Sequence, residues 1–363
     1  MHQSRIAEFH QIPLISETEL KSSWLKDGPQ VSIVCTTFNH EKYLEDAIRG
    51  FLIQKTEFPF EIILHDDAST DGTRDIIRRY AEAYPTIIKP VYQSENQYSK
   101  GVLMLLHAAS YATGEFVAFC EGDDYWLDSD KLQTQVDTLQ RFPQADICFH
   151  AAIKTIKEQV QPLLFCRRGE GECMLDVRAI IREGGSFMPT AAMLLRTSFF
   201  DRIGAETTDF YRRNLDAYFF QIFASLRGGA VYIDRPMSVY RSFSEGSWTQ
   251  TVNQDQTFYK KWAVNYLEAL RETDNMTGHV HGADIIVSIR RCHLSVLNNN
   301  ALDLNFRRDY FNQHRKELGL YGALLWHGVF RMPRIHTRVK KARALLQAVR
   351  TRQRVIGGGH GAV

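Results

Sequence analysis

Several features that would assign the chain to a particular class are missing from its 363 residues. It has no uninterrupted apolar run of about 18 residues, which a membrane-spanning helix would need. Its six cysteines include no Cys-x-x-Cys pair, which disfavours a zinc ribbon or a disulfide framework. No Gly-x-Gly-x-x-Gly motif follows the first predicted strand, so the usual dinucleotide-binding fingerprint is excluded. The first 20 residues lack an apolar core followed by a cleavage-like site, and we therefore expect a cytoplasmic protein without a signal peptide.

Net charge is also small, but it is unevenly distributed. The chain has 44 Lys or Arg and 42 Asp or Glu, which give a net charge of +2. Residues 331–354 contain nine Lys or Arg and no acid, whereas residues 1–317 carry 35 basic and 42 acidic side chains. One local basic segment disfavours a general nucleic-acid binder. This segment suits an amphipathic helix bound peripherally to the inner face of the cell membrane, and it also suits a solvated helix that neutralises the acidic part of the chain.

The apolar pattern from Gln30 onward alternates short β-rich runs with amphipathic helical runs. This alternation predicts an α/β protein with a mostly parallel central sheet and helices on both faces. From about residue 251 the pattern is helical. We expect an N-terminal extension (1–29), an α/β domain (30–250) and a helical C-terminal region (251–363). The predicted strands are 31–35, 61–65, 87–92, 116–120, 191–195 and 230–233.

Polar side chains follow three of these strands, at the point where each strand ends. They are Thr36, Thr37 and Asn39 after the first strand, Asp66 and Asp67 after the second, and residues 121–124 after the fourth. Because ligands of parallel α/β sheets bind beyond the carboxyl ends of the strands, we expect these three groups to form one site.

The acids in this set favour two kinds of chemistry. The adjacent carboxylates of Glu121, Asp123 and Asp124 repel one another, and a divalent cation would offset that repulsion. Hard oxygen ligands suit Mg²⁺ or Mn²⁺, which complete their coordination with substrate phosphates. Asp66 or Asp67 could accept a hydrogen bond from a nucleobase N–H, which selects uracil or thymine. The alternatives are a plain polar turn at 121–124 and helix capping after the second strand.

Three segments of the chain carry a resemblance to a known family. They are Val31-Ser-Ile-Val-Cys-Thr-Thr-Phe-Asn39, Ile62-Ile-Leu-His-Asp-Asp-Ala-Ser-Thr-Asp-Gly-Thr73 and Ala112-Thr-Gly-Glu-Phe-Val-Ala-Phe-Cys-Glu-Gly-Asp-Asp-Tyr-Trp126. Together they resemble the family-2 glycosyltransferases, which are inverting enzymes of the GT-A fold. The resemblance is close over residues 30–145 and looser to about residue 250. It implies a Rossmann-like GT-A sheet with helices on both faces and a helical C-terminal extension.

The resemblance also implies roles for individual residues. Asp123 would be the direct ligand of Mn²⁺ or Mg²⁺, while Glu121 stands where the family's Asp-x-Asp motif has its first Asp. Trp126 would stack on an acceptor sugar or belong to the core. Arg241 would contribute in place of a His that often follows the Tyr-Arg pair, where this chain has Phe243. The implied nucleotide-sugar site comprises Thr36, Thr37, Asn39, Asp66, Asp67, Asn96, Glu121, Gly122, Asp123 and Arg241.

An inverting transfer needs a carboxylate that takes the proton from the acceptor hydroxyl. In the family this base precedes a helix, a Gly, a strand and a Tyr-Arg pair, a layout that residues 214–241 share. Asp216 is therefore the predicted general base. Its alternative role is a helix N-cap, and Asp209 and Asp234 are the rival bases.

These expectations combine into an inverting, metal-assisted glycosyltransferase. The donor would be a nucleoside-diphosphate sugar, with UDP preferred, and the acceptor a hydroxyl of a glycan or lipid-linked glycan in cell-envelope polysaccharide biosynthesis. Two other classes stay open: a non-catalytic nucleotide- or glycan-binding module of the same fold, and a nucleotidyltransferase. The second is disfavoured because residues 36–40 contain neither the Gly nor the cation expected of its phosphate-binding loop.

Overall fold

The computed structural model describes residues 2–156, 163–214 and 216–326. It divides the chain into two compact units, residues 1–288 and 289–363. The division expected at residue 250 does not coincide with this one, because helix α12 (Gln256–Met276) packs within the first unit, where Tyr266 stacks on Tyr218 with ring centroids 5.5 Å apart. The basic segment 331–354 lies outside the described residues.

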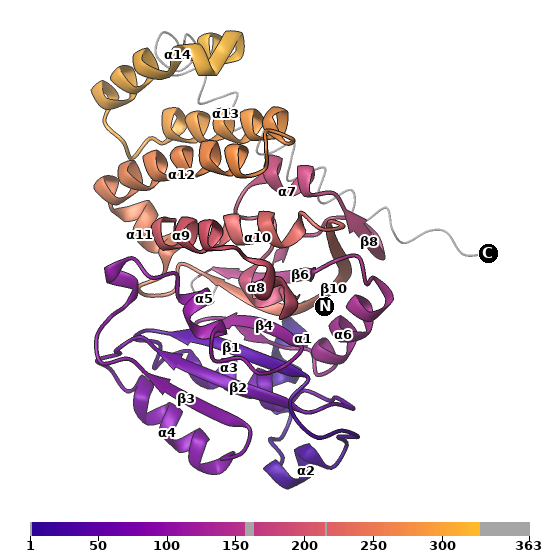
Figure 1. Cartoon of the computed structure of the whole chain (residues 1–363). Coiled ribbons are helices and arrows are strands. Elements are labelled where there is room, and N and C mark those ends of the chain that lie inside the picture. Colours follow the sequence, from indigo (N-terminus) through magenta and orange to yellow (C-terminus); the bar gives the residue numbers. More distant parts are fainter. Residues whose placement is uncertain (1, 157–162, 215, 327–363) are drawn as a thin grey trace, which may run out of the picture. The chain divides into compact units, whose positions relative to one another are not determined.

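Strands and helices alternate through most of the first unit (Figure 1). The strands are β1 (Val31–Thr37), β2 (Phe60–Asp66), β3 (Ile88–Tyr92), β4 (Phe116–Glu121), β5 (Tyr125–Trp126), β6 (Ile147–Ile156), β7 (Leu163–Phe165), β8 (Glu172–Leu175), β9 (Leu194–Arg196) and β10 (Ala230–Ser242). The α-helices are α1 (His2–Gln11), α2 (Glu17–Lys21), α3 (Leu44–Leu52), α4 (Thr73–Ala83), α5 (Met104–Ala109), α6 (Lys131–Arg141), α7 (Val177–Glu183), α8 (Ser198–Arg202), α9 (Ala205–Arg213), α10 (Ala217–Ser225), α11 (Trp248–Gln254), α12, α13 (Gly282–Asn298) and α14 (Leu304–Trp326). Two short 3₁₀ helices are η1 (Tyr98–Lys100) and η2 (Thr190–Ala192).

The strands form one sheet in the order β3-β2-β1-β4-β9-β6-β10-β5, and outside this order β7 pairs with β6 and β8 pairs with β10. The pairs β2–β3, β1–β2, β1–β4 and β6–β10 are parallel, as the alternation of strands and helices predicted. The predicted strand at 191–195 forms instead as η2 followed by β9, and β9 runs antiparallel to both β4 and β6. The sheet is therefore mixed at its centre and parallel on the side that carries the polar strand ends.

Side chains alternate between the two faces of this sheet because successive residues of a strand point to opposite sides. On one face Ile33 of β1 belongs to a buried cluster with Phe51 of α3. On the other face Phe119 of β4 meets Phe220 of α10, with ring centroids 5.7 Å apart. Burial on both faces explains why these strands read as continuous apolar runs.

Strand β10 is longer than the four residues expected at 230–233 and passes through Pro236. Proline has no N–H to donate, and the pairing register with β6 shifts between Ile233 and Ser238. The strand resumes after this irregularity and carries Arg241 to the turn that follows β4, where its backbone N–H donates to Asp124 Oδ1 at 2.8 Å.

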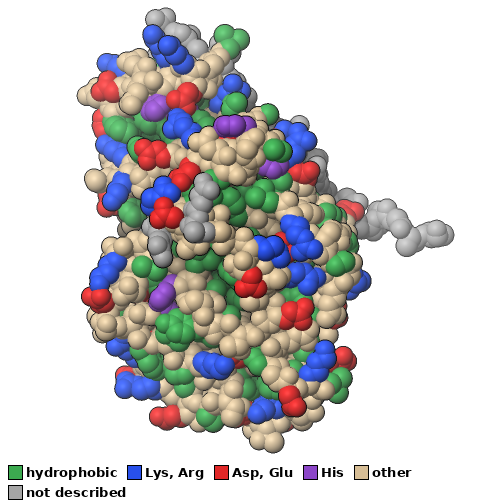
Figure 2. All heavy atoms as spheres, viewed as in Figure 1, with side chains coloured by type: hydrophobic (Ala, Val, Ile, Leu, Met, Phe, Trp, Pro, Cys, Tyr) green, Lys and Arg blue, Asp and Glu red, His purple; other side chains and the backbone are tan. Residues whose placement is uncertain are grey.

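Two surface properties bear on function. In the described part of the chain, no helix has both the length and the apolarity that crossing a membrane requires. Over the described residues of the face drawn in Figure 2, basic and acidic side chains are interspersed, so this face has no extended area of one sign.

Candidate active site

Backbone hydrogen bonds join the carboxyl ends of three neighbouring strands. The carbonyl of Thr37, at the end of β1, accepts from the N–H of Asp67, just beyond β2, at 2.9 Å. The carbonyl of Thr36 accepts from the N–H of Gly122, just beyond β4, also at 2.9 Å. The three polar groups predicted to share one site therefore lie side by side.

Asn39 has a structural role in the loop after β1. Its backbone is left-handed (φ 56°), a conformation that asparagine tolerates better than most residues. Its Oδ1 accepts from the N–H of Thr70 at 2.8 Å, and its own N–H donates to Ser69 Oγ at 2.9 Å. Asn39 thus fastens the loop after β1 to the loop after β2.

The two acids at the end of β2, Asp66 and Asp67, are buried and already hydrogen-bonded. The Asp66 side chain has 0% exposure, accepts from Arg74 Nε at 2.6 Å and also accepts from the N–H of Ser69. Asp67 accepts from the N–H groups of Gln97 and Tyr98, at 2.7 and 3.0 Å. Arg74 and the loop backbone thus already engage the Asp66 carboxylate, and the expected contact of Asp66 with a nucleobase stays a prediction.

Asp67 instead positions the segment that contains Asn96 and Tyr98. Asn96 stabilises the same turn, since its Oδ1 accepts from the N–H of Ser99 at 2.7 Å. The Tyr98 side chain is 42% exposed. Partial burial raises the pKa of its phenol, and the negative charges of Asp216 and Glu121 raise it further. Tyr98 therefore lies within electrostatic range of both the predicted base and the acidic strand end, a position that its sequence context did not reveal.

The acidic strand end, residues 121–124, concentrates negative charge in a buried place. Burial and the neighbouring Asp123 raise the pKa of Glu121 to about 7, while a hydrogen bond with the Thr190 side chain opposes this. Asp124 is 1% exposed and its Oδ2 has no hydrogen-bond partner. Its pKa is raised well above the ordinary value, first by burial and then by Asp123 and Glu121. An excess of buried carboxylate oxygen, including an unpaired atom, fits a divalent cation.

Close packing at the strand end requires a glycine at position 122. A Cβ atom there would lie 2.8 Å from His40 Nδ1 and 3.0 Å from the Cβ and Oγ1 atoms of Thr37. His40 Nδ1 and Thr37 Oγ1 are both buried without a hydrogen-bond partner. Thr36, the residue before Thr37, is half-buried at the same edge. This edge of the sheet thus contains buried polar atoms without hydrogen-bond partners, next to the carboxylates of residues 121–124.

Two residues from the end of β10 hold Asp123. The hydroxyl of Ser244 donates to its Oδ2 at 2.5 Å, and Arg241 Nη1 donates to its backbone carbonyl at 3.0 Å. The guanidinium of Arg241 also pairs with Asp46 and lies 4.4 Å from the ring centroid of Tyr125. Arg241 is therefore built into the wall of the site, while Ser244, which we did not predict, directly contacts the expected metal ligand.

Trp126 does not have the role of an acceptor contact. It is 0% exposed, and its indole N–H donates to the carbonyl of Ala191 at 2.8 Å. The buried ammonium group of Lys131 lies 3.7 Å from its ring centroid. The prediction of sugar stacking is wrong, because Trp126 is fully buried against Phe51 and Lys131; the alternative of a core aromatic is confirmed.

Asp216 lies at the start of α10, as its predicted N-cap role requires. Its Oδ1 accepts from the N–H of Tyr218 at 2.9 Å, and its Oδ2 accepts from Trp262 Nε1 of α12 at 3.3 Å. Burial raises the pKa of this carboxyl, while the two hydrogen bonds oppose the rise. Asp216 is thus a half-buried acid with increased basicity and a fixed orientation. Trp262 was missed because it is 46 residues away in the sequence.

The two rival bases have less suitable surroundings. Asp209 is exposed and pairs with Arg213 at 3.3 Å. Asp234 accepts two hydrogen bonds from the guanidinium of Arg167, at 2.9 and 2.7 Å. That pairing lowers the pKa of Asp234, which makes it a weaker proton acceptor. Among the three candidates, Asp216 has the environment that a general base needs.

Comparison with known proteins adds a family and a fold. Residues 32–204 match the family model described as "Glycosyl transferase family 2". The uncharacterized protein Rv1520 of Mycobacterium tuberculosis is 34% identical over 240 residues, 63% of this chain and 64% of its own length. The Escherichia coli UDP-Glc:alpha-D-GlcNAc-diphosphoundecaprenol beta-1,3-glucosyltransferase WfgD is 30% identical over 114 residues, 31% of this chain and 42% of WfgD. The chain therefore matches less than two thirds of the length of either relative.

A solved structure supports the fold over almost the whole chain. The mannosyltransferase PcManGT of Pyrobaculum calidifontis, in complex with GDP-Man and Mn²⁺, superposes with a TM-score of 0.51 at 19% identity. The match covers 96% of this chain and 89% of PcManGT. The predicted GT-A fold is thereby confirmed.

Proposed function

We propose that the chain is a member of glycosyl transferase family 2, whose model matches residues 32–204, and that it transfers a sugar from a nucleoside-diphosphate donor to an acceptor hydroxyl, with inversion at the anomeric carbon. The observation that carries the proposal is the group of partly or fully buried carboxylates at residues 121–124, beside the joined ends of β1, β2 and β4, in which Asp124 Oδ2 has no hydrogen-bond partner. The negative charges of both Asp216 and Glu121 raise the pKa of Tyr98, which agrees with a base on one side of a sugar and a metal site on the other. Inverting transfer needs this arrangement, because the acceptor attacks on one side of the sugar while the diphosphate leaves on the other.

Asp123, with Glu121 beside it, is the proposed ligand for Mn²⁺ or Mg²⁺. The unpaired oxygen of Asp124 and the raised pKa of Glu121 support this, since both record uncompensated negative charge. A divalent cation there would supply positive charge to the departing diphosphate. The chain itself contributes orientation: Ser244 fixes one carboxylate oxygen of Asp123, and Arg241 fixes its backbone.

Asp216 is the proposed general base. It takes the proton from the acceptor hydroxyl as that oxygen attacks, so it must be ionised beforehand. Partial burial makes it a better proton acceptor than an exposed aspartate, and the hydrogen bonds from Trp262 and the N–H of Tyr218 hold its carboxylate in place. These hydrogen bonds also favour its ionised form, because they oppose the rise in pKa that burial causes.

For the substrates we propose a UDP-sugar donor and a lipid-linked glycan acceptor. The name of WfgD contains both classes, and this chain is 30% identical to WfgD over 114 residues. PcManGT was solved with GDP-Man, so the base has to be tested directly. A thermal-shift and calorimetric screen of UDP, GDP, CDP and dTDP, each with and without Mn²⁺, should give metal-dependent stabilisation by UDP. No response of the folded protein to any nucleotide would contradict a donor site.

The replacement Asp216→Asn tests the activity itself. It keeps the N-cap acceptor but removes the base, so we expect turnover to fall by about 10²–10⁴-fold while donor affinity is retained. Asp209→Asn is the matched control, because it changes an exposed aspartate nearby and should leave turnover unaltered. Equal turnover in Asp216→Asn and the wild type would exclude Asp216 as base. Donor binding without turnover in the wild type, across a panel of acceptors, would favour the non-catalytic module.

A further inference from the structure

The C-terminal unit contains a convergent group of ligating side chains that has no part in the proposed transfer. His293 lies on α13, and His314 and Glu317 lie one turn apart on α14. One ligand atom from each residue lies within 4.8 Å of the other two. We refer to these three residues as the His–His–Glu cluster. In the described part of the chain it is the one group of three or more His, Cys, Asp or Glu side chains that meets this criterion.

The distances within the His–His–Glu cluster match the edges of a metal polyhedron. His293 Nε2 is 3.2 Å from one Glu317 carboxylate oxygen, and His314 Nδ1 is 3.6 Å from the other. Nitrogen and oxygen ligands 2.0–2.2 Å from a tetrahedral Zn²⁺ are separated by about 3.4 Å. Small rotations of the side chains could therefore bring one atom of each residue to a common ion.

The environment of His293 is typical of a metal-binding histidine. Its side chain is 0% exposed, and its Nδ1 lies 2.9 Å from the hydroxyl of Tyr310. A partner on one ring nitrogen fixes the ring orientation and directs the other nitrogen to the ion. Here that other nitrogen, Nε2, faces Glu317. Exposure rises from His293 through His314 (17%) to Glu317 (40%), so one side of the cluster is open to solvent.

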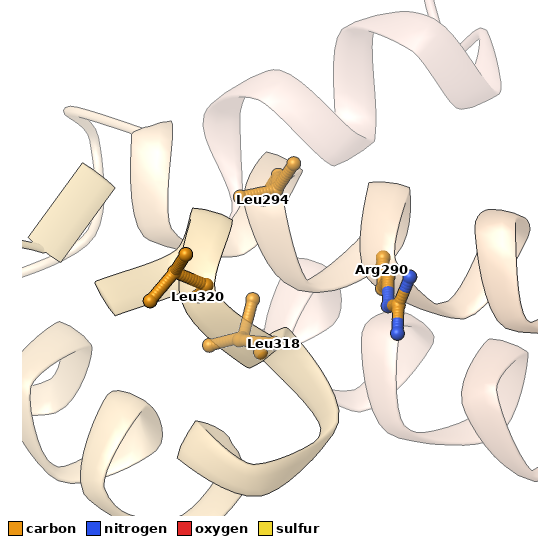
Figure 3. A pocket seen from close by; sticks show the side chains of 5 residues that line it. Arg290, Leu294, Leu318 and Leu320 are labelled. Atoms are coloured by element: carbon orange, nitrogen blue, oxygen red, sulfur yellow. The ribbon is translucent and has the colours of Figure 1, made fainter. Parts of the chain in front are cut away.

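Packing between the two helices leaves room for such a cross-link. A pocket of about 270 Å³ is lined by Arg290 and Leu294 of α13 and by residues 318–320 of α14 (Figure 3). At Gly319 the backbone is non-helical (φ 60°, ψ −160°), which interrupts α14 just after Glu317. Arg290 Nε, at the wall of this pocket, donates to the backbone carbonyl of Glu317 at 3.4 Å, so the pocket adjoins the cluster. A metal ion bound to both helices would add to this contact between α13 and α14.

We propose that the His–His–Glu cluster binds Zn²⁺ and cross-links α13 and α14 within the C-terminal unit. Two imidazoles and one carboxylate suit this borderline ion, whereas the all-oxygen strand end suits Mn²⁺ or Mg²⁺. The site lies outside the residues matched by the family model, 32–204, and is independent of the proposed transfer.

The test uses the full chain, purified without a histidine tag and stripped of metal with a chelator. Titration with Zn²⁺, followed by elemental analysis after desalting, should show one bound equivalent and a higher midpoint of thermal unfolding. Co²⁺ in place of Zn²⁺ should give the visible absorption of a tetrahedral site. His314→Ala should lose the bound equivalent, the thermal shift and the cobalt spectrum. Position 314 is chosen because His293 is buried, and its removal could prevent folding.

Two controls make the result specific. His279→Ala removes an exposed histidine that also contacts a carboxylate, Asp274, at 2.9 Å, and it should keep the zinc. Asp123→Ala should keep it as well, so that failure of this site and failure of the proposed donor site are distinguishable. Absence of zinc binding in the wild type, or equal binding in folded His314→Ala, would overturn the proposal. Glu317→Gln keeps the size of the side chain and should weaken zinc binding. That result would identify the Glu317 carboxylate as a ligand.

Discussion

The acidic strand end and the His–His–Glu cluster contain different donors, brought together in different ways. The first consists of residues 121–124, neighbours in the sequence, and offers oxygen atoms alone. The second combines nitrogen and oxygen from residues up to 24 positions apart, on two helices. Donors of the first kind suit hard cations that also bind phosphate, and donors of the second kind suit zinc. Ligand type therefore distinguishes the proposed catalytic metal site from the proposed structural one.

The two places share one principle of construction. In each, a hydroxyl group from elsewhere in the chain orients a ligand: Ser244 donates to Asp123, and the Tyr310 hydroxyl lies 2.9 Å from His293 Nδ1. Such partners outside the direct ligands tune both orientation and affinity. We therefore expect that a substitution in one region changes metal binding there and leaves metal binding in the other region unaltered.

The largest expected effect comes from Asp123→Asn, which removes the proposed ligand charge with little change in shape. Loss of several kcal/mol of metal-mediated stabilisation corresponds to a decrease of about 10³-fold in metal-dependent transfer. The zinc content of the same preparation should stay at the wild-type level. Asp130→Asn, at an exposed aspartate seven positions on, is the control. Loss of zinc together with transfer would show that the two regions are not independent.

A smaller effect is expected from Ser244→Ala, which leaves Asp123 in place but removes its hydrogen bond. Affinity for Mn²⁺, measured by titrating transfer activity, should fall by about 10–100-fold. Ser242→Ala is a matched control on the same strand end, because the Ser242 hydroxyl is buried without a hydrogen-bond partner. If the two variants weaken Mn²⁺ equally, the hydrogen bond of Ser244 has no special role.

The smallest effect is expected from Trp262→Phe. This variant changes the surroundings of Asp216, the proposed base, and leaves the proposed metal ligands at residues 121–124 unchanged. The indole N–H stabilises ionised Asp216, so its loss raises the pKa of that carboxyl further. Because the ionised form is active, the acid limb of kcat/KM against pH should move to higher pH. A lost hydrogen bond of about 1 kcal/mol corresponds to a shift of somewhat less than about one pH unit.

Trp24→Phe is the control for this shift, since the indole nitrogen of Trp24 is buried without a hydrogen-bond partner. It should leave the pH profile unchanged. If the rate of Trp262→Phe falls equally at every pH, Trp262 contributes to packing and does not influence the pKa of Asp216. Mn²⁺ affinity should be unaltered in both variants, because neither changes the acidic strand end.

The sequence predicted most of the strands whose ends form the proposed donor site. Strands β1, β2 and β4 are short apolar runs that end in polar groups, and their parallel pairing places those groups at one edge. The N-cap role of Asp216 was also predicted, because an aspartate before an apolar helical run is a local signal. The antiparallel strand β9 was harder to predict, because its three residues are too few to show the alternation of a strand.

What the sequence determined by itself is local: the alternation of strands and helices, the three strand-end motifs, and the acids that they contain. Tertiary structure alone decided which of those acids are already occupied. Asp66 accepts a hydrogen bond from Arg74. Trp126 is buried in the core. From the sequence alone, we expected both side chains to be available to a substrate. Tertiary structure also supplied the partners from distant segments, such as Trp262 on Asp216, and it assembled the His–His–Glu cluster from two helices. The physical reason is that burial and hydrogen bonding depend on what packs against a residue, and sequence neighbours do not specify that.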